Sequence, residues 1–150
     1  YAAGLTINEE NIDSFRNAMN EIGRRILSKE NLVPEMFLDM SLKISEISEA
    51  LHKQIALMEP FGAENPSPVF LIQCVSVSKL KRLGREESHV RFQVIQGDAR
   101  INAIGFNLAK KFASINYESD KIDLACELQV NDWKGRQKLE LKVLDLCCSS

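Results

Sequence analysis

Hydrophobic residues recur at helical spacing near the start of the chain. One apolar helix face is formed by Ile12, Phe15, Met19, Ile22 and Ile26. Asn8 can cap this helix, because its side chain can accept a hydrogen bond from the first turn. Over residues 36–44 apolar and polar residues alternate, which predicts a half-buried strand. A short strand over residues 2–7 and a second helix capped by Ser45 complete an α/β unit over residues 1–59.

The hydrophobic period changes to two in the second half of the chain. Five strands are predicted, over residues 69–77, 89–94, 100–106, 124–130 and 139–143. A short helix over residues 108–115 separates the third strand from the fourth. This order is that of an OB-fold, a five-stranded Greek-key barrel. An SH3-like barrel is the alternative, but its usual connections leave no place for the helix. The predicted fold class is therefore α+β, an α/β unit followed by a five-stranded β-barrel.

Three of the four prolines fall in residues 60–68. Each fixes φ, removes a backbone donor and restricts the residue before it to extended geometry, so neither helix nor sheet can run through this segment. The charge also changes here, from 6 basic and 11 acidic residues before residue 69 (net −5) to 13 and 10 after it (net +3). We therefore predict a domain over residues 1–59, a linker over 60–68 and a barrel domain over 69–150.

The composition is that of a globular protein, with 45% hydrophobic and 27% charged residues among 150. No apolar run approaches the roughly 20 residues of a membrane span, and no signal peptide precedes Ala2, so we expect a cytoplasmic protein without a membrane partner. The opening at Tyr1 indicates a segment of a longer protein. Cys74 and Cys126 lie in apolar runs and are predicted to be reduced core residues.

The sequence contains no catalytic constellation. It lacks a phosphate-binding GxxxxGK[ST] motif, a nucleophile elbow and any serine, histidine and acid at triad-like spacing. No cysteine or histidine spacing is that of a zinc site. We assign no catalytic residue and no metal ligand, and predict that this segment alone is not an enzyme.

Basic and aromatic residues fall where OB-folds bind oligonucleotides, on strands two and three and in two of the loops. The predicted contacts are Lys79, Lys81, Arg82 and Arg85 in the first loop, Arg91 on the second strand, and Trp133, Lys134 and Arg136 in the last hairpin. Trp133 would stack on a base beside these cations. Other interpretations stay open: Trp133 as a lid on the barrel, the first loop as merely solvated, and Phe106 as a core residue. Acidic neighbours weaken the patch, so we predict a weak or moderate single-strand binder.

Residues 58–70 read Met-Glu-Pro-Phe-Gly-Ala-Glu-Asn-Pro-Ser-Pro-Val-Phe. They resemble the Leu-x-Pro-Phe-Gly-x-Gly-Asn-Pro-x-Pro-x-Phe signature of RecJ-type single-stranded-DNA exonucleases. Residues 1–7 are similar to the end of the family's Gly-Gly-His-x-x-Ala-Ala-Gly motif, residues 102–107 to its third OB strand, and residues 131–145 to its final hairpin. The resemblance covers essentially the whole chain. Glu64 stands where the signature has glycine and places a negative charge in the linker.

The resemblance implies that residues 1–59 end a DHH-associated domain and that an OB domain follows. It implies a 5′-to-3′ exonuclease on single-stranded DNA that acts in recombination and repair. Its Mn²⁺ or Mg²⁺ ligands would lie in Asp-His-His motifs that this chain lacks, so no cofactor is expected in this segment. Ala3 and Gly4 carry over as backbone near the DNA phosphates. The implied partner is single-stranded DNA, with a repair or single-strand-binding protein as a further candidate.

Two other functions stay open from the sequence. The OB-fold could be a protein-docking module that recruits a repair partner, because OB barrels serve both ends. The chain could also belong to a DHH phosphodiesterase that acts on short RNA. Salt separates docking from single-strand binding, whose affinity falls with a log–log slope of about −0.7 per phosphate contact. Since backbone contacts and stacking carry little sequence information, we expect low base preference.

Overall fold

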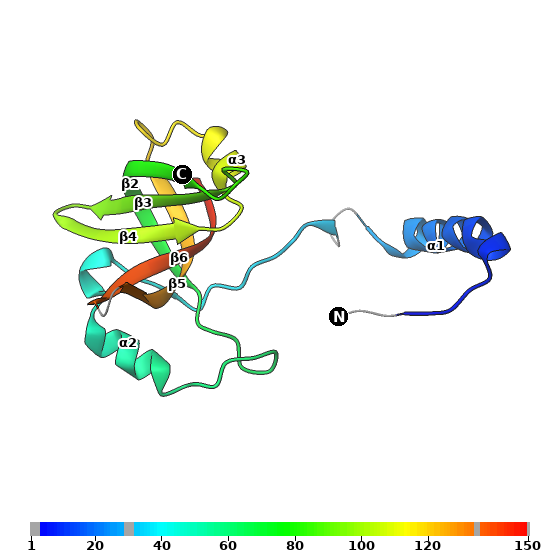
Figure 1. Cartoon of the computed structure of the whole chain (residues 1–150), viewed down its shortest axis with the longest axis horizontal. Coiled ribbons are helices and arrows are strands. Elements are labelled where there is room, and N and C mark those ends of the chain that lie inside the picture. Colours follow the sequence, from blue (N-terminus) through cyan, green and yellow to red (C-terminus); the bar gives the residue numbers. More distant parts are fainter. Residues whose placement is uncertain (1–3, 29–31, 134–135, 150) are drawn as a thin grey trace. The chain divides into compact units, whose positions relative to one another are not determined.

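The computed structural model describes residues 4–28, 32–133 and 136–149. Its contacts divide the chain into two units, residues 1–36 and 37–150. In the first unit a short 3₁₀ turn, Glu9–Asn11, leads into helix α1, Ile12–Ile26 (Figure 1). The predicted helix is confirmed, and the five apolar residues of its face are exposed. Asn8 precedes the turn but makes no side-chain cap hydrogen bond, and no strand forms over residues 4–8.

The second unit is a closed barrel. Its strands are β2 Phe70–Leu83, β3 His89–Gln96, β4 Ala99–Gly105, β5 Ile122–Trp133 and β6 Arg136–Cys148. They pair in the order β2-β3-β4-β6-β5, and a β2–β5 pairing closes the sheet. The β4–β6 pair is parallel and the other pairs of the barrel are antiparallel. Helix α3, Ala109–Ala113, lies between β4 and β5 in sequence. The predicted OB barrel and its helix are confirmed.

Alternation along the strands builds the core, as the period of two predicts. Val90, Phe92 and Val94 on β3 are at most 2% exposed. From α3, the Phe112 ring packs edge-on against Phe92 and Tyr117, with centroid distances of 4.8 and 5.8 Å. The helix thereby fills one end of the barrel with an aromatic plug.

The two cysteines predicted to be buried differ. Cys126 on β5 is fully buried, and this burial, aided by the charge of Glu127, raises the pKa of its thiol to about 12. Cys74 on β2 is exposed, so its prediction was wrong. The reason is a bulge between Ile72 and Val75, in which Cys74 adopts a positive φ of 55° and leaves the inward alternation.

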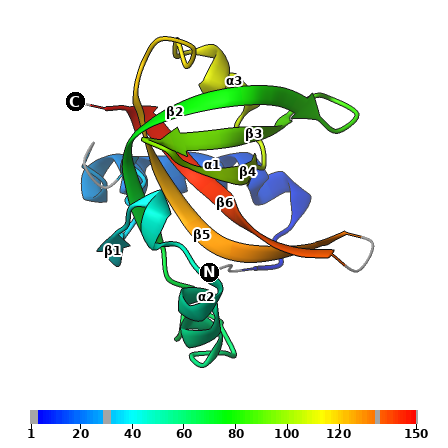
Figure 2. The ribbon, with the colours of Figure 1, turned by 90° about the vertical axis from the view of Figure 1, so that its left-hand side faces the viewer.

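Residues 37–56 pack against the barrel. Strand β1, Met40–Ser41, pairs parallel with the start of β2, so the predicted strand over residues 36–44 is reduced to two residues. Helix α2, Glu49–Ala56, is capped by Ser48, which accepts a hydrogen bond from the Leu51 N–H at 3.2 Å, and not by Ser45. Buried residues before and within α2 join the barrel core. Figures 1 and 2 show α2 and α3 at opposite ends of the barrel.

Strand β2 is longer than the sequence predicts. It continues to Leu83, so most of the predicted basic loop is strand and the connection to β3 is confined to residues 84–88. A register shift between Ser78 and Lys81 absorbs Lys79, whose φ is 53°. The resulting β2–β3 hairpin and the β5–β6 hairpin both project beyond the barrel in the view of Figure 2.

Candidate nucleic-acid interface

The outward side chains of β3, β4, β6 and β5 form a continuous surface, which we call the outer face. Strand register places its residues in rows across the sheet. One row consists of Arg91, Ile104, Lys142 and Glu127. The next row consists of Gln93, Asn102, Glu140 and Gln129. β3 and β4 are the second and third strands of the OB order, and β6 and β5 lie beside them in the sheet. The outer face therefore includes the two strands on which the sequence predicts nucleic-acid contacts.

Glu140 lies at the centre of the outer face, yet only 4% of it is exposed. Its carboxylate accepts three hydrogen bonds, from Arg91 Nη2 at 3.1 Å, Gln129 Nε2 at 2.8 Å and Asn131 Nδ2 at 3.0 Å. The donors come from β3 and β5, on either side of β6. A buried carboxylate needs such partners, because leaving a charge unpaired costs several kcal/mol. Glu140 therefore fixes the position of Arg91, which the sequence singled out as a phosphate contact.

The β2–β3 hairpin separates the four cations that the sequence assigned to one loop. Lys81 faces Arg91 directly across the hairpin, so these two predicted contacts lie together. Arg82 instead lines a surface cavity of about 400 Å³ beside α3, with Lys110 and Glu86 also in its wall. All four cations are exposed, Lys79 at the bulge and Arg85 in the remaining connection. Only Lys81 thus adjoins Arg91 in the strand register.

Phe106 directly follows β4 and is 50% exposed, so the interpretation as a core residue was wrong. It is the next outward residue after Ile104, and its ring meets the His89 ring edge-on with a centroid distance of 5.3 Å. His89 is itself held in place, because Asn107 N–H donates to its Nδ1 at 3.0 Å. The result is an aromatic surface whose position is fixed by its neighbours and which remains open to solvent.

For several predicted contacts the structure does not describe a side chain. Ala3 and Lys134 are outside the described residues. Trp133 and Arg136 pair with each other through their backbones at the end of the β5–β6 hairpin, but their side chains are not described. Gly4 belongs to the first unit and is exposed. Their roles stay predictions.

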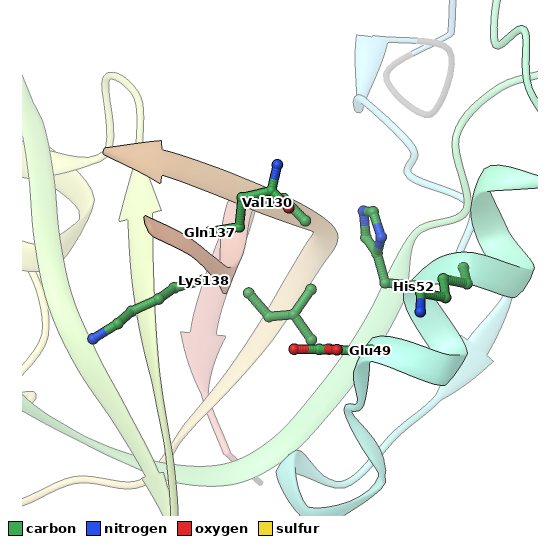
Figure 3. Close-up of a pocket in the computed structure, with 7 residues that line it drawn as sticks. Glu49, His52, Val130, Gln137 and Lys138 are labelled. Carbon is green, nitrogen blue, oxygen red and sulfur yellow. The ribbon is translucent and has the colours of Figure 1, made fainter. Parts of the chain in front are cut away.

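A second cavity, of about 240 Å³, lies between α2 and the β5–β6 hairpin. Figure 3 shows Glu49 and His52 of α2 on one side and Val130 and Gln137 on the other, with Lys138 pointing away from the helix. Val130 is opposite Leu139 in the register and provides an apolar wall. No group of three or more His, Cys, Asp or Glu that could hold a metal ion occurs here or elsewhere in the described residues.

Comparison with known proteins identifies the barrel. The family model of the RecJ OB domain matches residues 38–145. The chain belongs to the RecJ OB domain family. The single-stranded-DNA-specific exonuclease RecJ of Bacillus subtilis (strain 168) is 25% identical over 148 residues, which is 99% of this chain and 19% of that protein. The RecJ of Haemophilus influenzae is 25% identical over 145 residues, 95% of this chain and 25% of that protein.

A solved structure shows the same fold. RecJ from Thermus thermophilus in complex with Mn²⁺ superimposes with a TM-score of 0.73 at 22% identity, over 96% of this chain and 20% of that one. The chain thus spans about a fifth to a quarter of the length of these RecJ proteins. None of its described helices has the length and apolar character needed to cross a membrane.

Two groups of residues on the outer face of this RecJ OB domain were not predicted from the sequence. The outward position of Gln129 and Asn131 follows from the alternation that buries Leu124, Cys126 and Leu128, so the period of two could have found them. Glu140 could not be singled out in this way, because its burial depends on donors from β3 and β5.

Proposed function

We propose that this chain is the single-stranded-DNA-binding region of a RecJ-type 5′-to-3′ exonuclease that acts in the cytoplasm in recombination and repair. The observation that carries the proposal is the half-exposed Phe106, held against His89 on the same side of the sheet as Arg91. Membership of the RecJ OB domain family supports single-stranded DNA as the partner. In this proposal residues 1–59 end a DHH-associated domain, residues 60–68 are a linker, and the barrel binds the strand.

Stacking and charge would share the binding. Every base has an aromatic face, and stacking on an exposed aromatic side chain is worth about 1–3 kcal/mol per base. Phe106 offers such a surface, and Trp133 at the hairpin end would offer a second. The phosphates would be neutralised by nearby cations. These are Lys79, Lys81, Arg82, Arg85, Lys134 and Arg136, with the backbone of Ala3 and Gly4 as further contacts.

The chemical step would take place in another part of the intact protein. The described residues provide no cluster that fits a metal ion. Two Thermus thermophilus RecJ structures are complexes with Mn²⁺ and with Mg²⁺, which supports metal-dependent cleavage by the intact protein. This chain would bind the single strand that is cleaved elsewhere in the intact protein.

Fluorescence anisotropy of a labelled oligothymidylate tests the proposal. A length of about 16 nucleotides covers the largest site of one OB fold. With the 150-residue chain, we expect binding that weakens with salt at a log–log slope of about −0.7 per phosphate contact. Phe106→Ala should weaken binding about 5- to 150-fold, because it removes one stacking surface. Lys81→Ala should make the slope shallower by about 0.7.

Matched controls isolate the outer face. Phe37→Ala removes another exposed phenylalanine, 85% exposed and outside the barrel strands, and should leave the affinity unchanged. Lys53→Ala removes an exposed cation of α2 and should leave the slope unchanged. Equal effects of Phe106→Ala and Phe37→Ala would remove Phe106 from the interface. Absence of any binding at low salt would contradict the proposal and favour the protein-docking alternative.

A further inference from the structure

The centre of the outer face carries no net charge among the described side chains. Arg91 is paired with Glu140, and Lys142 with Glu127 at 2.9 Å. Toward the margins of this face lie exposed cations that form no ion pair with other described residues, among them Lys81, Arg100 and Lys138. A phosphate is attracted to the margins and not to a centre that contains a carboxylate. The centre is therefore suited to the uncharged part of a nucleotide, the base.

Glu140 determines how its amide neighbours are oriented. An ionised carboxylate only accepts hydrogen bonds, so Gln129 and Asn131 must turn their NH₂ groups toward it. The distances of 2.8 and 3.0 Å agree with this orientation. Their carbonyl oxygens consequently face away from Glu140. Within the described part of the chain neither oxygen accepts a hydrogen bond, and neither is among the buried atoms that lack a partner. Both oxygens are thus unpaired acceptors that are not fully buried.

Arg91 adds donors to these two acceptors. Its hydrogen bond to Glu140 uses Nη2, and the side chain is 47% exposed. A guanidinium has five N–H groups in a planar fork, so donors remain after Nη2 is used. All three side chains are held by the same buried carboxylate. The outer face therefore presents one donor group and two acceptors in a fixed arrangement.

We infer that this arrangement is a base-edge site that selects guanine in the bound single strand, an inference that rests on the proposed function. The Watson–Crick edge of guanine has one acceptor, O6, followed by two donors, N1–H and N2–H. Adenine, cytosine and thymine each have only one donor group on that edge. Arg91 donates to O6, and the carbonyl oxygens of Gln129 and Asn131 accept from N1–H and N2–H. This inference differs from the low base preference expected from the sequence, in which no local pattern indicates the Glu140 cluster.

Competition among matched oligonucleotides tests the inference with the 150-residue chain. The probe is an oligothymidylate of about 16 nucleotides with one central residue replaced by guanine, inosine, adenine or cytosine. Guanine should bind about fivefold tighter than thymine or more, as expected for a specific contact with a base edge. Inosine lacks the N2 amino group and should lose much of this gain. Equal affinity of all the probes would overturn the inference and leave the proposed function in place.

Substitutions of Glu140 and its neighbours test whether these side chains cause the guanine preference. Glu140→Gln no longer forces the two amides to face inward, so the ratio of the affinity for the guanine probe to that for oligothymidylate should fall at least severalfold. Asn131→Ala removes one acceptor, provides a second variant in case Glu140→Gln fails to fold, and should lower the same ratio. Glu118→Gln, an exposed carboxylate in a loop, is the control. An unchanged guanine preference in folded Asn131→Ala would overturn the site. Loss of binding to every probe by the unaltered chain would overturn the proposed function and the inference together.

Discussion

Cys74 and Cys126 lie on strands that pair with each other, yet only Cys126 is in the core. On β5 the alternation is uninterrupted from Leu124 to Leu128, so Cys126 points inward and its Sγ lies 3.6 Å from the Phe70 carbonyl oxygen. On β2 the bulge gives Cys74 a positive φ, and its N–H donates to Asp123 at 2.9 Å. One irregular residue thus changes a thiol from core to surface.

Thiol labelling of the native chain should follow this difference. Burial raises the pKa of Cys126 to about 12, so at pH 8 only about one thiol in ten thousand is ionised, and solvent cannot reach it. Thiolate is the reactive species, and an exposed cysteine has a pKa near 8.5. We expect Cys74, Cys147 and Cys148 to react rapidly with a maleimide, and Cys126 only after denaturation. Peptide mass spectrometry of the labelled chain measures this, and fast labelling of Cys126 in the native state would contradict the barrel core.

Sequence pattern determines single side chains where they depend on one strand alone. The inward positions of Val90, Phe92 and Val94 follow from alternation and are confirmed. Phe106 continues the outward positions of Asn102 and Ile104, so the alternation itself places it away from the core, and the core interpretation departed from this pattern. The environment of Glu140 requires three strands in register, which no local pattern contains. The surface chemistry of the outer face therefore became visible only with the fold.

At the scale of elements, a bulge in β2 explains why the sequence predicts this strand to be shorter than it is. The predicted loop is polar and basic, so its composition is typical of a connection. Lys81, Arg82 and Leu83 nevertheless pair with Arg91, Val90 and His89. The register shift after Ser78 breaks the period of two, and the alternation therefore cannot be followed through it. This longer strand brings Lys81 beside Arg91.

The junction between β4 and α3 has no room for a side chain at Gly105. A Cβ at Gly105 would lie 2.8 Å from Leu108 Cδ1 and 3.2 Å from Val90 Cγ2. Both neighbours are buried, so they have little room to move. Gly105→Ala should therefore lower the free energy of unfolding by about 1–3 kcal/mol, the usual cost of overpacking a core. Thermal or urea unfolding followed by circular dichroism measures the change.

Gly62→Ala is the matched control for this substitution. Gly62 is exposed, and nothing lies within 4 Å of the position of an added Cβ. Its effect on stability should be a few tenths of a kcal/mol at most, as for most surface substitutions. If Gly105→Ala were as harmless as Gly62→Ala, the close packing of Leu108 on the end of β4 would be wrong.

At the scale of the whole molecule, the order of strands and helix was predictable because each element has its own period. The residue at which the folding unit begins was harder to predict from the sequence, because it depends on contacts between distant segments. The sequence puts the boundary in residues 60–68, whereas the contacts form a unit that begins at residue 37. In that unit Asp39 N–H donates to the Val69 carbonyl at 2.8 Å, and Ile44 N–H donates to Gln96 Oε1 at 2.9 Å.

Truncation distinguishes the two boundaries. A fragment of residues 37–150 keeps the whole second unit, so we expect it to unfold at the temperature of the barrel in the full chain. A fragment of residues 69–150 loses Ile44 and Ile55, both at most 8% exposed. Burial of two such side chains contributes about 3–6 kcal/mol, comparable with the total stability of a small domain. We therefore expect the shorter fragment to be largely unfolded by circular dichroism and calorimetry. If it instead melted like the full chain, the barrel would fold without residues 37–59, and the contacts of these residues with it would contribute little to its stability.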